Sequence, residues 1–145
     1  MGRVFIGTVD CPFRAMDRLM KELADPPKVI IVDMHAEATS EKRAIGWYVD
    51  GRVSALVGTH THVPTADTRV LPKGTAYVTD LGMVGCTNSV IGVKTEDALE
   101  RFLTKRPRRL TVASSGPVRF ESVLIDVDET TGKATDIVRI DRELP

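Results

Sequence analysis

Two short apolar runs, each followed at once by a histidine-containing polar phrase, constrain the fold of this chain more than any other feature. The runs cover residues 29–32 and 53–57, and the segment between them has helical spacing over residues 39–49. Short, almost wholly apolar runs are typical of strands buried on both faces, which occur in parallel sheets covered by helices. The pattern therefore predicts an α/β chain with a strand, a helix and a second strand at its centre.

All three histidines of the chain follow these predicted strands. His35 comes after the first run, and His60 and His62 come after the second in the phrase Gly58-Thr59-His60-Thr61-His62. Open α/β sheets collect ligands outside the carboxyl ends of their strands. At strand spacing, His60 and His62 would point to the same side with Cα atoms about 6.6 Å apart. Both imidazoles would then reach one metal ion or two adjacent ions.

The remaining patterns predict a longer set of mixed elements. A helix beginning with Thr95 as N-cap would turn four apolar residues toward the core, namely Ala98, Leu99, Phe102 and Leu103. Residues 80–92 are rich in glycine and small polar residues, which is typical of a long loop. The other predicted strands cover residues 3–6, 68–71, 75–78, 118–127 and 133–140, and the other predicted helix covers residues 13–23.

Length and composition favour one domain, or a large part of one, over residues 1–145. The 20 Lys and Arg residues balance 20 Asp and Glu residues, so net charge gives no general signal for nucleic acid or membrane. No apolar stretch is long enough to span a bilayer, and the chain does not start with a signal-peptide pattern. Cys11 and Cys86 form no CxxC pair, which fits a reducing compartment, and we expect a cytoplasmic location.

Four phrases together resemble the bacterial YmdB-like metallophosphoesterases of the calcineurin-like superfamily. The phrases lie at residues 33–42, 57–67, 79–83 and 89–92, and the resemblance covers essentially the whole chain. It implies a four-layer α/β/β/α sandwich and the hydrolysis of 2′,3′-cyclic nucleotides or related phosphodiesters. It also implies a dinuclear centre of divalent metal ions, in which His35 and His60 are ligands of one metal and His62 of the other. Histidine-rich sites with oxygen ligands suit Fe, Mn or Zn.

The resemblance also implies parts that this sequence does not contain. In the family, the N-terminal half supplies an Asp, a bridging Glu and a Gly-Asn-His motif, so the chain looks like a truncated C-terminal half in which Met1 corresponds to an internal methionine. Two adjacent divalent cations repel each other unless a bridging carboxylate or hydroxide offsets the repulsion. The family's in-line attack on phosphorus by a metal-bound hydroxide would then need another chain, and no catalytic residue is assigned here.

Several residues near the histidines have two interpretations. Asp33 and Glu37 are candidates for orienting the ring of His35, although Glu37 equally suits a helix cap or a solvent-facing position. Asp67 is a candidate of the same kind or a simple turn residue. The segment around residues 82–89 either approaches the substrate through its glycines or is a flexible connector. Its candidates for substrate contact are Gly82, Met83 and Ser89.

One basic cluster is either an RNA contact or a solvated helix end, and consists of Lys105, Arg106, Arg108 and Arg109. Three hypotheses are therefore open: a phosphodiesterase half-site, a noncatalytic metal-binding or regulatory remnant of that fold, and a small RNA-binding protein. We expect the first. Sheet edges left open by the absent half also predict that the chain forms a homo-oligomer or pairs with a separate N-terminal half.

Overall fold

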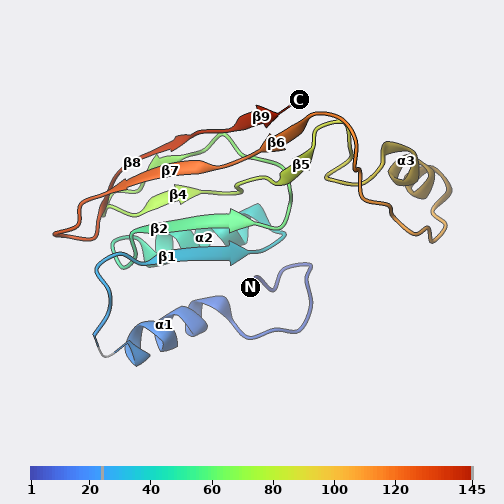
Figure 1. The fold of residues 1–145 in the computed structure, drawn as a ribbon. Coiled ribbons are helices and arrows are strands. Elements are labelled where there is room, and N and C mark those ends of the chain that lie inside the picture. The colour runs from blue at the N-terminus through green and yellow to red at the C-terminus, as the bar shows by residue number, and fades with distance from the viewer. Residues whose placement is uncertain (24, 145) are drawn as a thin grey trace.

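The structure, a computed structural model, describes residues 1–23 and 25–144 and has mixed α/β architecture (Figure 1). Its elements in chain order are α1 (Pro12–Glu22), β1 (Ile31–His35), α2 (Thr39–Val49), β2 (Ala55–Thr59), β3 (Arg69–Val70), β4 (Ala76–Val78), β5 (Val84–Cys86), α3 (Thr95–Thr104), β6 (Val118–Phe120), β7 (Val123–Val127), β8 (Ala134–Arg139) and β9 (Arg142–Leu144). The strands form a four-stranded sheet in the order β1-β2-β4-β3, a three-stranded sheet in the order β5-β6-β9, and the hairpin β7-β8.

The centre of the fold is the predicted unit of strand, helix and strand. β1 and β2 are parallel with His35 opposite Thr59, β2 and β4 are parallel, and β3 is antiparallel to β4. The helix α2 has the predicted bounds, whereas β1 and β2 begin and end two or three residues later than predicted. The run at residues 53–57 is buried throughout, as predicted, and the backbone pairing continues beyond it through Gly58 and Thr59. The prediction of a strand buried on both faces is wrong for β1, because Ile31 is 61% exposed and the buried residue of this strand is Met34.

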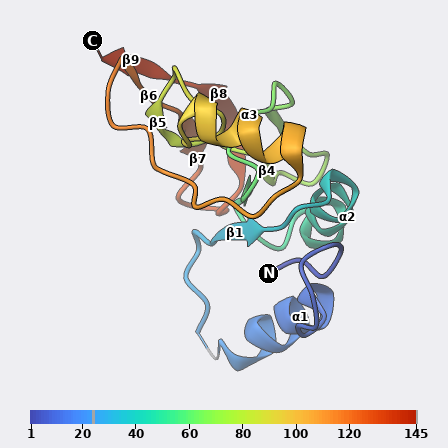
Figure 2. The same cartoon turned by 90° about the vertical axis from the view of Figure 1, so that its right-hand side faces the viewer.

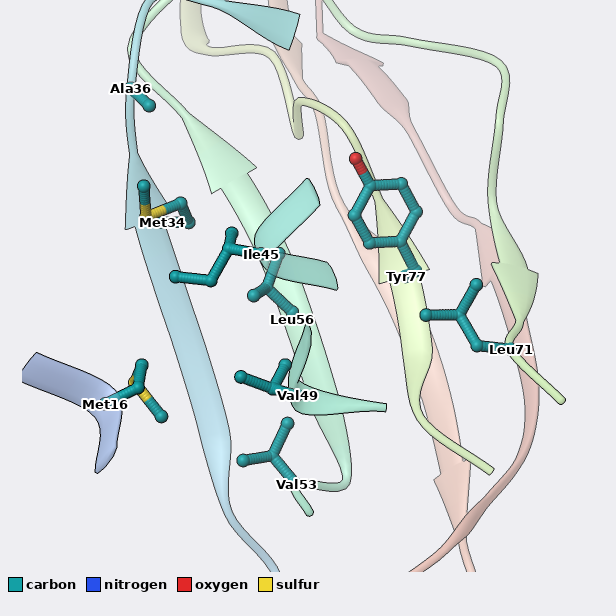
Figure 3. Packing of buried hydrophobic residues seen from close by; sticks show 9 residues of the cluster. All are labelled: Met16, Met34, Ala36, Ile45, Val49, Val53, Leu56, Leu71 and Tyr77. Carbon is teal, nitrogen blue, oxygen red and sulfur yellow. The ribbon is translucent and has the colours of Figure 1, made fainter. Parts of the chain in front are cut away.

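Alternate residues of the central strands pack into two separate cores. Leu56 and Tyr77 face α2 and pack with Ile45 and Val49 (Figure 3). Their strand neighbours face the opposite way, against the β7-β8 hairpin, and include Ala55, Val57, Ala76 and Val78. The described chain therefore has helices on one face of the central sheet and strands on the other (Figure 1). These layers position the carboxyl ends of β1, β2 and β4 at one common edge.

The N-terminal segment is a turn, so the strand predicted over residues 3–6 is wrong. The carboxylate of Glu41 accepts hydrogen bonds from the backbone amides of Arg3 and Val4, which satisfies donors that a strand would use in a ladder. Phe5 has a left-handed φ of 65°. The amide of Gly2 donates to the carbonyl of His35 at 2.8 Å, so the N-terminus lies beside the carboxyl end of β1 (Figure 1).

The N-cap of the helix α3 is Lys94 and not Thr95. Most of the residues predicted to turn toward the core from this helix are exposed instead. Ala98 is buried, but Leu99, Phe102 and Leu103 are 52%, 74% and 82% exposed. The helix stands at one end of the molecule, away from α1 and α2 (Figure 1), with loop segments beside it (Figure 2). A helical apolar pattern predicts a face that can be buried, but here the fold brings little against it.

Two further segments differ from the predicted elements. The loop predicted over residues 80–92 contains β5, which pairs with β6. The run predicted over residues 118–127 divides into β6 and β7, which belong to different sheets. The division falls at Glu121 and Ser122, where the amide of Ser122 donates to the Asp141 carboxylate and interrupts the strand.

Cys11 and Cys86 are free thiols. In the described residues, no helix combines the length and the apolar character that crossing a membrane requires.

Candidate metal centre

Three elements of the central sheet end at the edge where the histidines lie. His35 is the last residue of β1, and His60 follows β2 directly. The third element is β4, which leads into Thr79 and Asp80. The parallel directions of these strands bring their carboxyl ends together, as expected for the ligand-binding edge of an α/β sheet.

His35 and His60 are in direct contact. Nε2 of His35 lies 2.9 Å from Nδ1 of His60, and the two rings meet edge to face with centroids 4.6 Å apart. Nε2 of His60 lies 2.9 Å from the Glu37 carboxylate. On the other side, Nδ1 of His35 lies 3.2 Å from the Thr59 hydroxyl, which donates to Asp33 at 2.8 Å. The result is one continuous polar chain from Asp33 to Glu37.

The Thr59 hydroxyl fixes which ring nitrogen of His35 carries the proton. Because Thr59 donates its proton to Asp33, its oxygen is an acceptor for the N–H at Nδ1 of His35. A neutral His35 then presents an unprotonated Nε2 toward His60. Asp33 therefore acts on His35 through Thr59, while Glu37 contacts His60 and not His35. Each of the two carboxylates predicted beside His35 belongs to the polar chain, at opposite ends.

His62 is oriented by a different contact. Nδ1 of His62 lies 2.9 Å from the carbonyl oxygen of Ile91, which can only accept, so this nitrogen carries the proton. His60 and His62 have φ values of 101° and 63°, in the left-handed region. The predicted strand geometry for this pair is therefore wrong. Their rings contact different partners, because the chain leaves the strand after Thr59.

The donor set at this edge fits a divalent transition metal in its chemistry. Imidazole nitrogen suits Zn and Fe, and a hydrogen bond from the other ring nitrogen to a carbonyl or carboxylate is usual for metal-bound histidines. His62 has this arrangement through Ile91, and His35 has a related one through Thr59. In residues 1–23 and 25–144, however, no group of three or more His, Cys, Asp or Glu side chains could hold a metal ion. The described histidines thus offer part of a ligand set.

Asp67 has structural contacts in place of the predicted contact with a histidine. Its carboxylate accepts hydrogen bonds from the hydroxyls of Thr65 and Thr79 and from the amide of Thr79. Burial opposes ionisation of Asp67, but the bonds from Thr79 and Thr65 outweigh it and hold the pKa below its ordinary value. Asp67 therefore secures the chain at the end of β4.

The predicted substrate-contact segment is ordered by its own hydrogen bonds. The amide of Met83 donates to the Glu121 carboxylate at 2.6 Å, and the hydroxyl of Ser89 donates to the Cys86 carbonyl at 2.6 Å. Gly82 has φ of 96°, and an added Cβ would lie 2.0 Å from the Glu121 carboxylate. The segment reaches the histidines at Ile91, and substrate contact by Gly82, Met83 and Ser89 stays a prediction.

A buried ion pair contacts the histidine segment, residues 60–62, and neither of its members is among the predicted site residues. Nζ of Lys42 lies 2.6 Å from Oδ2 of Asp80, and both side chains are almost fully buried. Burial opposes ionisation of Asp80, but the bonds from Lys42, Thr61 and Gly82 outweigh it and lower the pKa of Asp80. A signal was present in the sequence, because Lys42 shares a helix face with Ile45 and Val49.

The basic cluster is partly neutralised by neighbouring carboxylates. Arg108 contacts Asp97 at 2.8 Å and is also paired with Glu100. The hydrogen bonds that the Asp97 carboxylate accepts from Thr111 and from Arg108 lower the pKa of Asp97. Lys105, Arg106 and Arg108 line a surface hollow of about 470 Å³ beside α3. RNA contact at Lys105, Arg106, Arg108 and Arg109 stays a prediction.

Comparison with known proteins gives a consistent assignment. The family model described as YmdB-like protein matches residues 1–140. The chain belongs to the YmdB-like family. A 2′,3′-cyclic-nucleotide 2′-phosphodiesterase of Bacillus subtilis (strain 168) is 52% identical to it over 139 residues, which are 96% of this chain and 52% of that protein.

Two solved structures extend the comparison to the fold. A hypothetical protein from Thermus thermophilus has a TM-score of 0.92 and 46% identity, covering 100% of this chain and 56% of that one. A protein described as a novel phosphatase from Mycoplasma pneumoniae has a TM-score of 0.87 and 36% identity, covering 95% of this chain and 48% of that one. The chain thus spans about half the length of the relatives it matches.

Proposed function

We propose that this YmdB-like chain contributes the histidine half of a metal-dependent phosphodiesterase site that hydrolyses 2′,3′-cyclic nucleotides or related phosphodiesters. The observation that carries the proposal is the meeting of His35 and His60 at 2.9 Å, with His62 in the same segment, at the carboxyl edge of the central sheet. The Bacillus subtilis relative, a 2′,3′-cyclic-nucleotide 2′-phosphodiesterase, supports the substrate class.

The residues of this chain have distinct roles in the proposed site. His35 and His60 would hold one divalent ion of Fe, Mn or Zn, and His62 would hold the second. Thr59 and the Ile91 carbonyl would keep the correct ring nitrogen of His35 and His62 unprotonated. When bound, such ions lower the pKa of water and neutralise charge on phosphoryl oxygens.

The remaining ligands would come from another polypeptide segment. Three neutral imidazoles do not offset the repulsion between two adjacent divalent cations, so a bridging anion is needed. Among the described strands, β1 has a neighbour only on its β2 side, and its Ile31 is 61% exposed. We propose that an N-terminal half or a second copy of the chain packs here and completes a four-layer α/β/β/α sandwich. An open strand edge is otherwise a site of unwanted pairing.

A noncatalytic remnant is the second candidate, and one observation favours it. The rings of His35 and His60 bond to each other, the His60 ring also contacts Glu37, and the described residues contain no cluster of three or more side chains that could hold a metal ion. Such a protein would keep the family fold and bind metal weakly or not at all. It would have a binding or regulatory role without turnover.

Hydrolysis of 2′,3′-cyclic AMP in the presence of Mn²⁺ or Fe²⁺ tests the two candidates. The assay compares the chain alone, the chain mixed with the N-terminal half of the Bacillus subtilis relative, and the double variant His60→Ala, His62→Ala. We expect turnover in the mixture and its loss in the double variant. A matched double substitution outside the site, Arg18→Ala with Glu22→Ala at an exposed position of α1, should leave turnover unchanged. A folded chain without turnover in either preparation would support the remnant and overturn the phosphodiesterase proposal.

A further inference from the structure

The buried pair of Lys42 and Asp80 connects three parts of the chain at the sheet edge where the carboxyl ends of β1, β2 and β4 meet. Lys42 comes from α2, and Asp80 follows β4. Besides Lys42, the Asp80 carboxylate accepts hydrogen bonds from the amide of Thr61 at 3.1 Å and from the amide of Gly82 at 2.9 Å. Thr61 is the residue between His60 and His62. One carboxylate therefore binds α2, the histidine segment and the start of the segment that begins at Gly82.

Core packing alone does not explain this pair. Moving two charges out of water is so unfavourable that apolar residues of similar volume often stabilise a protein equally well or better. The side chains of Lys42 and Asp80 are 0% and 1% exposed, so the desolvation is nearly complete. If the position of Lys42 on the buried face of α2 only had to fill space, an apolar residue would suffice, as Ile45 and Val49 do on the same face. The presence of a buried ion pair here therefore requires an explanation other than packing.

The backbone on either side of Thr61 supplies that reason. Residues other than glycine in the left-handed region are strained, and they persist only where the surroundings hold them. His60 and His62 both have left-handed φ values, and the amide between them donates to Asp80. A bond to an ionised acceptor is stronger than one to a neutral acceptor. The Asp80 carboxylate is therefore well placed to hold this strained segment.

The same carboxylate also acts on the far side of the loop. The amide of Gly82 donates to Asp80, and the carbonyl of Ile91 accepts a hydrogen bond from Nδ1 of His62. The segment from Gly82 to Ile91 is thus attached at its first residue to Asp80 and at its last residue to the His62 ring. A change at Asp80 should move both histidines and the loop together.

We infer that Lys42 and Asp80 are a positioning pair that sets the metal affinity of the histidine segment. Lys42 holds the carboxylate in place, and Asp80 holds His60 and His62 through the amide of Thr61. The metal-binding part of this inference rests on the proposed function. The geometric part, which concerns the backbone of residues 60–62, can be measured without any metal.

The test compares Asp80→Asn with a matched buried aspartate. Asp50 is also buried, accepts the amide of Lys73 with both oxygens at 3.2 Å, and lies before β2, at the opposite end of the strand from His60. Asp50→Asn therefore controls for general destabilisation. A third variant, Lys42→Met with Asp80→Asn, removes both charges and should fold, because neutral replacement of a buried pair is often well tolerated.

The first measurement is made by NMR on the metal-free chain. Amide hydrogen exchange at Thr61 and Gly82 should be at least about tenfold faster in Asp80→Asn, because bonds to a charged acceptor are lost. The couplings that report φ of His60 and His62 should also change. Asp50→Asn should leave both observables unchanged. Unchanged exchange and φ in folded Asp80→Asn, or in the double variant if that one alone folds, would overturn the inference.

The second measurement is Co²⁺ titration, followed by the visible absorption of imidazole-bound Co²⁺. We expect Asp80→Asn to weaken Co²⁺ binding by about 10- to 100-fold, as loss of groups that orient metal ligands does. Asp50→Asn should retain the wild-type affinity at a similar loss of thermal stability. Equal loss in the two variants would reduce the pair to a purely structural role. If the wild-type chain alone does not bind Co²⁺ through the histidines, the titration is repeated in the mixture with the N-terminal half of the Bacillus subtilis relative. Absence of binding in that mixture too would overturn the proposed metal site, and the NMR result alone would then decide the inference.

Discussion

Gly58→Ala tests the close approach that brings β2 against the end of β4. A Cβ at Gly58 would lie 1.7 Å from the carbonyl oxygen of Thr79 and 3.0 Å from Cδ of Lys42. The oxygen belongs to the backbone, so a side-chain rotation cannot relieve the overlap. Overpacking in a well-packed core costs about 1–3 kcal/mol and sometimes more. We expect a loss of about 3 kcal/mol, since one strand must move.

Thermal unfolding monitored by circular dichroism measures this loss. For a domain of this size, about 3 kcal/mol corresponds to a fall in Tm of roughly 10 °C. The matched control is Gly85→Ala, also in a strand, where the atoms nearest to the new Cβ are Cε and Sδ of Met83, both at an ordinary 3.6 Å. Gly85→Ala should change the Tm only slightly. Equal Tm values for the two variants would refute the claim that Gly58 is required by the backbone of Thr79.

The other predictions concern the core, α3 and acid stability. Ile45→Ala, in the core, should destabilise the chain by about 2–5 kcal/mol. Phe102→Ala, on the exposed face of α3, should change stability by only about 0.5 kcal/mol. Urea unfolding measures both losses, and similar values would contradict the exposed placement of Phe102. Asp67 has a lowered folded-state pKa, so its stabilisation is present above the unfolded pKa of about 3.9 and is lost as pH falls through the folded value. The difference in urea midpoint between wild type and Asp67→Asn should therefore be full at neutral pH and shrink below about pH 4. A constant difference down to low pH would exclude this role for Asp67.

The location of the site could be predicted because it follows from the order of elements. Apolar runs followed by histidines indicate strands that end together, and the register of His35 opposite Thr59 confirms that β1 and β2 do so. The orientation of the side chains could not be predicted in this way. His60 and His62 lie beyond the last paired residue, where strand alternation no longer applies and both residues have left-handed φ values. The Thr61 amide there donates to Asp80, and the His62 ring contacts the Ile91 carbonyl, which are contacts between segments far apart in the sequence.

The prediction for α3 was wrong for a different physical reason. A helical apolar pattern describes only the helix itself, and its burial depends on what the rest of the fold supplies. The same periodicity is present in α2, where Ile45 and Val49 are buried because β2 and β4 lie beneath them (Figure 3). Beside α3, the described chain supplies short loop segments (Figure 2). Phe102 therefore stays exposed.

Lys42 shows where the sequence contained more than its apolar pattern indicates. A charged residue on the buried face of α2 breaks the local rule, and such breaks are expected at functional or strained sites. The partner could not be identified from sequence, because Asp80 is 38 residues away and joins the helix only when β4 lies beside β2. Once the sheet is formed, the pair lies directly beneath Thr61. A lysine at a core position is therefore a signal for the same edge of the sheet that the histidines indicate.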